Sequence, residues 1–248
     1  MRLIVYGPSG VGKTSLAANF PDVGFIYDPK EQGIEELVAF GQCPDPVFKV
    51  EAPEWDSLLT LVRDAAMGRL GAIQFLALDS LTGMQNLCFQ YHCRKYFKDD
   101  WSDQGFMAFH RGPVNAAQTD WPELLESLDI CVQRGITPVI LGHSQVKPFN
   151  NPMGADYDRF IADSHKEIWS QTHKWASAIL FYSFDADIKK EGLKKKADQS
   201  TERRMIYTQH SPAYDAKNRF GLSPAIDAGD SGESAFAALK SCFQKALK

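Results

Sequence analysis

The feature that most constrains the fold is the stretch GPSGVGKTS at residues 7–15, which directly follows the apolar run LIVY. Its first eight residues fit the pattern G-x-x-x-x-G-K-[ST] at every fixed position. Glycines let backbone N–H groups turn inward around phosphate oxygens, and a helix that begins here adds the positive end of its dipole. The sequence therefore predicts a phosphate-binding loop between a buried strand at residues 3–6 and a helix at residues 15–20.

Two side chains of this loop have predicted roles in nucleotide binding. Lys13 places a point charge on the β- and γ-phosphates, and the Thr14 hydroxyl ligates Mg²⁺. Because the same loop serves kinases, GTPases, motors and recombinases, it predicts the ligand and leaves the reaction open. The predicted nucleotide-binding residues are Gly7, Pro8, Ser9, Gly10, Val11, Gly12, Lys13, Thr14 and Ser15.

A second apolar run, FLALDS at residues 75–80, ends in an acid. A parallel sheet brings the end of such a strand beside the phosphate loop, where a carboxylate holds Mg²⁺ through water. We therefore predict that Asp79 is the second metal residue and that Ser80 supports the metal shell. The alternative is an Asp-Ser helix cap that follows a core strand.

A third strand, at residues 23–27, runs into the sequence Asp28-Pro29-Lys30-Glu31. Strand ends in such sheets face the ligand crevice, so an acid here can orient the attacking water. Glu31 is the predicted base and Asp28 is its rival. The alternative for either residue is an exposed loop acid.

Strands alternate with helices along the rest of the chain, which predicts a doubly wound, mostly parallel sheet flanked by helices. We expect one domain over residues 1–248, because no linker-like stretch divides it, and no N-terminal module before it, because the first strand begins at residue 2. The remaining predicted helices are at residues 54–67, 120–134 and 231–248, and the remaining strands are at 136–142, 176–184 and 203–209.

Composition limits the partners and the compartment. The formal net charge of -4 argues against coating of nucleic acid by bulk charge, so any DNA contact must come from local patches. No apolar run reaches the length of a membrane span, so no membrane partner is expected. Five scattered cysteines without a secretory signal indicate reduced thiols in a cytoplasm. The group Cys88, His92, Cys93 and His110 lacks standard zinc spacing, so these thiols are interpreted as structural.

The order of these motifs resembles the RecA-like ATPase core. The shared motifs are the phosphate loop, the acid Glu31 after the strand at residues 23–27, FLALDS, and a later strand that ends in ILGHSQVK at residues 140–147. The stretch AKNRFGLS at 216–223 resembles the Sak-four group of phage and prophage RecA-core ATPases, which are single-strand annealing proteins. This resemblance covers nearly the whole chain and implies that the nucleotide is ATP with Mg²⁺. One departure is the Asp-Pro-Lys-Glu sequence in place of a plain acid-Glu pair, which leaves Asp28 as an alternative base.

The resemblance also implies further catalytic residues beside Lys13 and Asp79. His143, at the end of the ILG strand, would sense the γ-phosphate, although a structural histidine is the alternative. Lys217 and Arg219, in a loop before the last helix, would neutralise charge in the transition state, in their own subunit or in a neighbour's. The alternative for this pair is a solvated basic turn.

The resemblance places single-stranded DNA on two loops, at residues 98–118 and 146–165. Aromatic side chains there can stack on bases while Lys and Arg meet phosphates, and the predicted DNA-binding residues are Lys147, Phe149 and Arg159. Both loops also carry acids, so two ordinary long loops are the alternative. The lysine-rich run at 189–196 is predicted to be a hairpin or a disordered tip, with an auxiliary phosphate contact as its functional interpretation.

These observations predict a DNA-stimulated ATPase that acts on single-stranded DNA in phage-type recombination or annealing. The expected partners are single-stranded DNA, further copies of the chain and a single-strand-binding protein, in the cytoplasm of a bacterial host if the chain is phage-encoded. One alternative is a small-molecule or nucleotide kinase, although the sequence has no clear Arg-rich lid. The other is a nucleotide-driven assembly or packaging motor.

Overall fold

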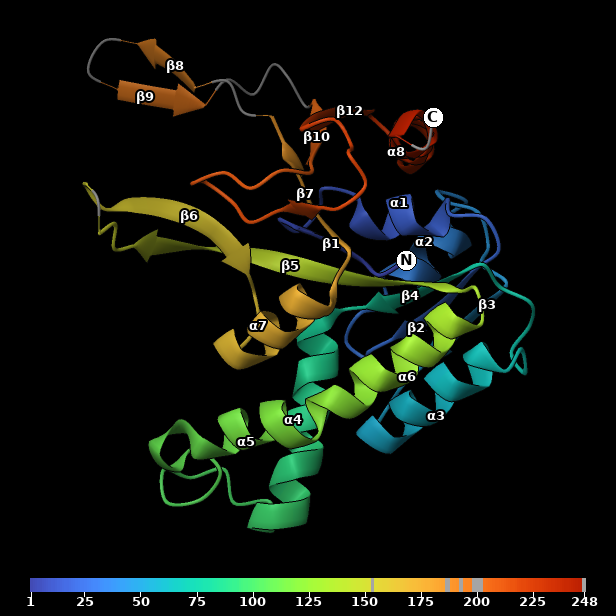
Figure 1. Cartoon of the computed structure of the whole chain (residues 1–248), viewed down its shortest axis with the longest axis vertical. Coiled ribbons are helices and arrows are strands. Elements are labelled where there is room, and N and C mark those ends of the chain that lie inside the picture. Colours follow the sequence, from blue (N-terminus) through green and yellow to red (C-terminus); the bar gives the residue numbers. More distant parts are fainter. Residues whose placement is uncertain (153, 186–187, 192–193, 198–202, 247–248) are drawn as a thin grey trace.

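A large sheet runs through the middle of the molecule, and helices cover both of its faces (Figure 1). The structure is a computed structural model that describes residues 1–152, 154–185, 188–191, 194–197 and 203–246. The strand order is β12 (Ala225–Gly229), β10 (Arg204–Tyr207), β7 (Ala178–Phe184), β1 (Leu3–Gly7), β5 (Thr137–Phe149), β4 (Phe75–Asp79), β2 (Val23–Tyr27) and β3 (Phe48–Glu51).

In this order, each neighbouring pair from β7–β1 to β2–β3 is parallel, and the pairs β12–β10 and β10–β7 are antiparallel. The predicted fold class, a doubly wound and mostly parallel sheet flanked by helices, is confirmed. Every residue of β1 and β2 is buried, as expected for parallel strands covered on both faces. The carboxyl ends of the parallel strands meet at one edge, here named the carboxyl edge, and their starts form the amino edge.

Alternation along β1 separates two cores. Leu3 and Val5 face one apolar cluster, and Ile4 and Tyr6 face the other, because successive side chains of a strand point to opposite faces. The first cluster is covered by α1 (Lys13–Ala18), α2 (Gly33–Ala39) and α8 (Gly232–Ala246). The second is covered by α3 (Trp55–Ala66), α4 (Leu81–Phe97), α5 (Arg111–Thr119), α6 (Trp121–Gln133) and α7 (Lys166–Trp175).

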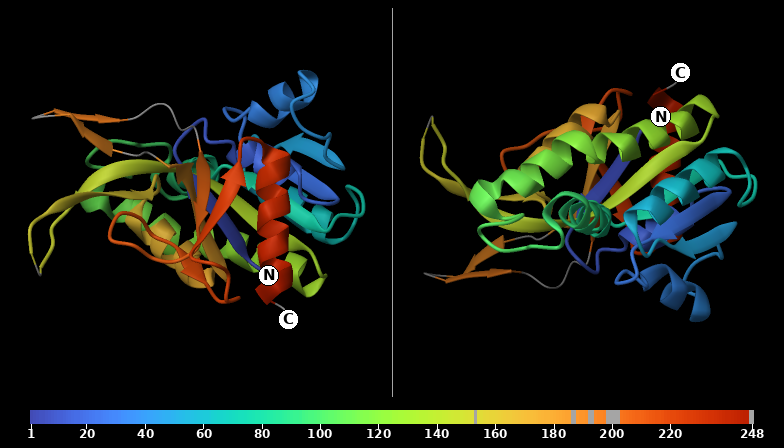
Figure 2. Two further views of the ribbon diagram at one scale, coloured as in Figure 1. Left: turned by 90° about the horizontal axis from the view of Figure 1, so that it is seen from above. Right: turned by 90° about the horizontal axis from the view of Figure 1, so that it is seen from below.

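The segment at residues 146–165 is mostly a β-hairpin, so its prediction as a loop was wrong. Strand β5 continues past Gly142 to Phe149 and pairs antiparallel with β6 (Tyr157–Ala162), with Lys147 opposite Arg159. Aromatic side chains on the two strands meet, since the Phe149 and Tyr157 ring centroids are 5.2 Å apart. Figure 2 shows this hairpin extending beyond the rest of the sheet.

The second half of the segment at 98–118 is helical, so the prediction of one long loop was also wrong. The short turn η1 (Ala108–His110) leads directly into α5, whose Ala116 and Ala117 are buried. Phe106 is fully buried between Phe97 and Phe89 and fixes the start of this element. The second half of the segment is therefore held in a helix by the burial of its apolar side chains.

The lysine-rich run contains two antiparallel strands, β8 (Ile188–Glu191) and β9 (Lys194–Ala197), which agrees with the hairpin alternative. Residues 192–193 of that run and residues 247–248 of the predicted last helix lie outside the described residues. Within the described ranges, no helix is both long and apolar enough to cross a membrane.

Candidate functional site

The loop at residues 7–15 connects β1 to α1 at the carboxyl edge. Gly10 and Gly12 have φ angles of 77° and 99°, which glycine adopts without the steric strain of a Cβ. Gly7 has a different requirement, because a Cβ there would lie 1.8 Å from the backbone oxygen of Tyr182 on β7. The glycines of the motif are therefore required by the turn and by the neighbouring strand.

Lys13 is 6% exposed and points back over its own loop. Its Nζ donates to the backbone oxygens of Gly7 at 3.1 Å and Pro8 at 2.9 Å. Burial lowers the pKa of Lys13 to about 8, while Asp79 and Glu31 act in the opposite direction. This places a cationic nitrogen between the loop and two acids.

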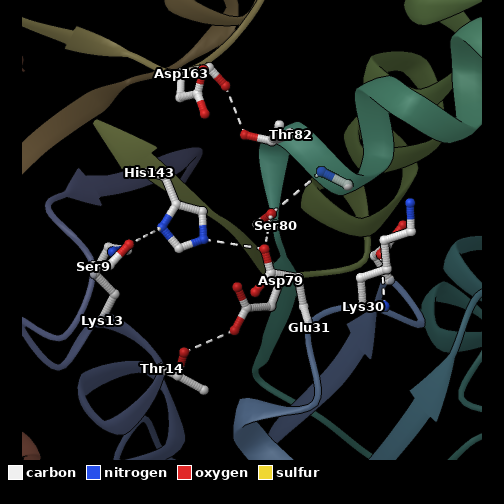
Figure 3. A network of polar contacts seen from close by, with 12 residues as sticks. Ser9, Lys13, Thr14, Lys30, Glu31, Asp79, Ser80, Thr82, His143 and Asp163 are labelled. Atoms are coloured by element: carbon white, nitrogen blue, oxygen red, sulfur yellow. Dashed lines mark hydrogen bonds and ion pairs between the residues drawn. The ribbon is translucent and has the colours of Figure 1, made fainter. Parts of the chain in front are cut away.

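Asp79 ends β4 and meets the first turn of α1. The Thr14 hydroxyl donates to Asp79 Oδ2 at 2.8 Å (Figure 3). Burial raises the pKa of Asp79 to about 6, and the bond from Thr14 opposes that rise. A hydroxyl and a carboxylate in contact are oxygen donors of the type that Mg²⁺ prefers, so these two predicted metal residues fit that ion.

Glu31 reaches the same place from the turn after β2. Its Oε1 accepts a hydrogen bond from the Ser80 hydroxyl at 3.0 Å and lies 3.1 Å from His143 Nε2. The other ring nitrogen of His143 lies 3.3 Å from the Ser9 hydroxyl, so the ring joins the phosphate loop to the acid (Figure 3). The hydrogen bond from His143 lowers the pKa of Glu31, and burial opposes this.

Asp28, the rival base, is buried in the turn itself. Its Oδ1 accepts from the backbone N–H of Lys30 at 2.8 Å, and its own N–H donates to the backbone oxygen of Asp79 at 2.9 Å. Gly83 of α4 packs directly on it, since a Cβ there would come within 2.5 Å of Asp28 Cβ. The geometry therefore favours Glu31 over Asp28 as the group that faces a ligand.

One cleft of about 500 Å³ is lined by Lys13, Thr14, Glu31, Asp79 and His143, and it also extends to α2 and the turn after it. Sequence reasoning missed this second wall, in which the Phe40 side chain is 78% exposed. A large apolar residue at the C-cap of a short helix was the available signal. The lining residues are Gly10, Gly12, Lys13, Thr14, Ser15, Glu31, Gly33, Glu36, Leu37, Phe40, Gln42, Asp79 and His143.

Lys217 and Arg219 do not meet this cleft. Lys217 lies on a two-residue strand, β11 (Lys217–Asn218), rather than in a loop, and pairs with Ile179 near the start of β7. That position is at the amino edge, because the start of β7 pairs with Leu3 at the start of β1. Lys217 Nζ donates to the backbone oxygen of His173 at 2.7 Å, whereas Arg219 is exposed.

The three predicted DNA-binding residues come together on the β5–β6 hairpin. Lys147 is exposed and opposite Arg159, whose guanidinium carbon lies 5.4 Å from the Phe149 ring centroid. The hairpin projects from the carboxyl edge, where the cleft also lies, since His143 and Lys147 belong to one continuous strand. Figure 2 shows the β8–β9 hairpin extending on the same side.

The thiols considered for zinc binding are core residues of α4. Cys88 and Cys93 are buried, and the buried His92 ring forms a hydrogen bond with the Asp120 carboxyl group. In the part of the chain that the structure describes, His, Cys, Asp and Glu side chains form no group of three or more that could hold a metal ion. His92 therefore connects α4 to the start of α6.

The chain was compared with known families, curated proteins and solved structures. A family model described as an AAA domain, AAA_24, matches residues 1–220. A solved KaiC-like protein from the hyperthermophilic archaeon Pyrococcus horikoshii OT3 is similar at 12% identity and a TM-score of 0.48, covering 94% of this chain and 87% of that chain. No curated protein shows significant sequence similarity to the chain.

Proposed function

This chain belongs to the AAA_24 family of AAA domains, and from that premise we propose that it hydrolyses ATP with Mg²⁺ and acts on single-stranded DNA. The family and the mostly parallel sheet support a P-loop ATPase domain, and we propose that its core is RecA-like. The observation that carries the hydrolysis proposal is that Lys13, the Thr14–Asp79 pair and the Glu31–His143 pair converge in one cleft.

The phosphate end of the cleft suits a magnesium–nucleotide complex. Thr14 and Asp79 would hold the ion, which supplies neutralisation of charge on the β- and γ-phosphates. Lys13 adds a fixed positive charge to the same phosphates. Glu31 is a carboxylate at neutral pH, and the hydrogen bond from His143 lowers its pKa further, so it could orient the attacking water and accept its proton.

The α2 wall suits the base of the nucleotide. Phe40 is exposed and lines the cleft, so its ring offers an apolar surface on which a base can stack. Phe40→Ala should weaken ATP binding about ten-fold and leave binding of inorganic tripolyphosphate unchanged. Equal losses for both ligands in titration calorimetry would contradict a base-stacking role.

The position of Arg219 supports action on a neighbouring copy. It follows β11 at the amino edge, several residues along the sheet from the phosphate loop of its own chain. An exposed arginine at that edge can reach a cleft only if the carboxyl edge of a second copy faces it. We therefore propose a head-to-tail homo-oligomer in which Arg219 neutralises transition-state charge in the neighbour, while Lys217 fixes the end of α7.

The hairpin is the proposed DNA contact. Phe149 and Tyr157 offer aromatic faces, and Lys147 and Arg159 offer positive charge beside them. Because the whole chain is acidic, one subunit attracts DNA weakly, and several hairpins side by side would bind a strand together. Strand annealing in phage-type recombination, with a single-strand-binding protein as a partner, is the role that we assign to this activity.

Steady-state ATP turnover with and without a single-stranded oligonucleotide tests the proposal. We expect Mg²⁺-dependent turnover that rises when the oligonucleotide is present. Phosphate transfer to a nucleoside or nucleotide acceptor would instead identify a kinase. Turnover without any response to DNA would indicate an assembly or packaging motor.

A further inference from the structure

A second positive side chain lies directly against the phosphate loop, on the opposite side from Asp79. Arg204 on β10 pairs with Phe184 of β7, and Tyr182 of β7 is two residues earlier. A Cβ atom at Gly12 would lie 3.1 Å from Arg204 Nη1 and 3.7 Å from the Tyr182 hydroxyl. The strands on the far side of β1 therefore bring a guanidinium and a phenol to the start of α1.

Each group has one buried polar atom that lacks ordinary hydrogen-bond geometry within the described residues. Tyr182 is fully buried, and among the described residues neither its hydroxyl nor the buried Nε of Arg204 has a partner with ordinary hydrogen-bond geometry. Burial raises the pKa of Tyr182 and the nearby Arg204 guanidinium opposes that rise, so the two groups interact electrostatically. The Arg204 guanidinium lies over the Phe184 ring, with 5.7 Å from its carbon to the ring centroid, and in the described residues it forms no ion pair with a carboxylate. The adjacent Arg203 differs, because it is exposed and bonds Asp227 through two nitrogens.

A half-buried cation that lacks a counter-ion among the described residues and lies beside an anion-binding loop gains its counter-ion when the anion binds. We infer that Arg204 supplies a second fixed positive charge to the phosphate chain of the bound nucleotide, acting from behind Gly12, and that Tyr182 holds the guanidinium there. Lys13 supplies charge from the cleft side of the loop, and Arg204 supplies it from the β10 side. Arg204 is thus a positioning residue, and the inference rests on the proposed nucleotide function.

Two substitutions separate charge from packing. Arg204→Gln keeps a polar side chain of moderate length and removes the charge, whereas Arg204→Lys keeps the charge. Arg203→Gln is the matched control, because it removes the same charge one residue away from a side chain that already has a carboxylate partner. Tyr182→Phe removes only the hydroxyl that interacts with the guanidinium.

Titration calorimetry of the full chain with Mg–ATP, AMP and inorganic tripolyphosphate reads out the effect, with unfolding temperatures measured without ligand. We expect Arg204→Gln to weaken ATP and tripolyphosphate binding about ten-fold and AMP binding much less. Arg204→Lys should recover most of the affinity, Tyr182→Phe should lose less than Arg204→Gln, and Arg203→Gln should match the parent.

Parent-like affinity in Arg204→Gln would overturn the inference and leave the nucleotide function intact. Equal losses in Arg204→Lys and Arg204→Gln, with equally lowered unfolding temperatures, would assign Arg204 to packing and also overturn it. If the parent binds tripolyphosphate but not ATP, the proposed function fails while the tripolyphosphate series still decides the role of Arg204. If Arg204→Gln does not fold, the ATP and tripolyphosphate affinities of Arg204→Lys and Tyr182→Phe decide the role of Arg204.

Discussion

The cleft and the β5–β6 hairpin lie at the same edge of the sheet but are built differently. In the cleft, three parallel strands and a turn bring Lys13, Asp79, Glu31 and His143 into contacts that fix each side chain. On the hairpin, Lys147 is exposed and lies opposite Arg159 on a ribbon that projects beyond the sheet. Fixed polar groups suit the chemistry of a small ligand, and an exposed ribbon suits a flexible polymer.

Among the substitutions considered, removal of the positive charge of Lys13 has the largest expected effect on the cleft. Lys13→Ala should lower ATP turnover about 10³-fold, because this nitrogen is the positive charge between the loop and the acids. Turnover of purified protein measures it. Lys30→Ala is the control, since that exposed lysine lies in the turn beside Glu31, and an active Lys13→Ala protein would refute the site.

The base and the neighbouring arginine can be tested together. Glu31→Gln and Arg219→Ala should each lower turnover about 10²-fold or more while ATP binding is kept. A mixture of the two inactive proteins should regain activity, because some interfaces then combine an intact Glu31 with an intact Arg219 from the neighbour. Residues acting within one chain would leave the mixture inactive. Asp28→Asn should instead lower the unfolding temperature, as expected for a buried turn residue.

Asp79 in the cleft is expected to affect the folding stability of the protein as well as its activity. Burial favours its protonated form, so the folded protein holds this proton more tightly than the unfolded chain does. The contribution of Asp79 to the free energy of unfolding is therefore greatest below pH 3.8 and is lost as pH rises through about 6. Asp79→Asn should raise the unfolding free energy at pH 7 by about 1–3 kcal/mol without nucleotide or Mg²⁺ and abolish hydrolysis. Denaturant titration measures this, and a destabilised variant would contradict it.

The hairpin prediction has the smallest expected effect, because each subunit contacts few phosphates. Lys147→Ala combined with Arg159→Ala should weaken oligonucleotide binding about ten-fold and remove DNA-stimulated turnover, with DNA-free ATP binding intact. The matched control is Lys174→Ala with Arg134→Ala, which removes the same charge from exposed sites on α7 and after α6. A loss in both double variants would indicate a bulk charge effect.

The sequence predicted the cleft better than the hairpin for a physical reason. The loop, Asp79 and Glu31 follow apolar strands, and parallel pairing brings such strand ends together whatever the rest of the chain does. The extension of β5 beyond Gly142 depends instead on pairing with residues 157–162, which local sequence does not reveal. Phe40 and Arg204 were missed for the same reason, because only tertiary contacts bring α2 and β10 to the loop.

We propose that nucleotide bound in the cleft promotes the binding of single-stranded DNA on the hairpin. Fluorescence anisotropy of a labelled single-stranded oligonucleotide, with and without a non-hydrolysable ATP analogue, tests it most directly. We expect weak binding alone, tight binding with the analogue, and loss of the tight state in the Lys147→Ala, Arg159→Ala protein. Absence of oligonucleotide binding by the parent under both conditions would contradict the claim.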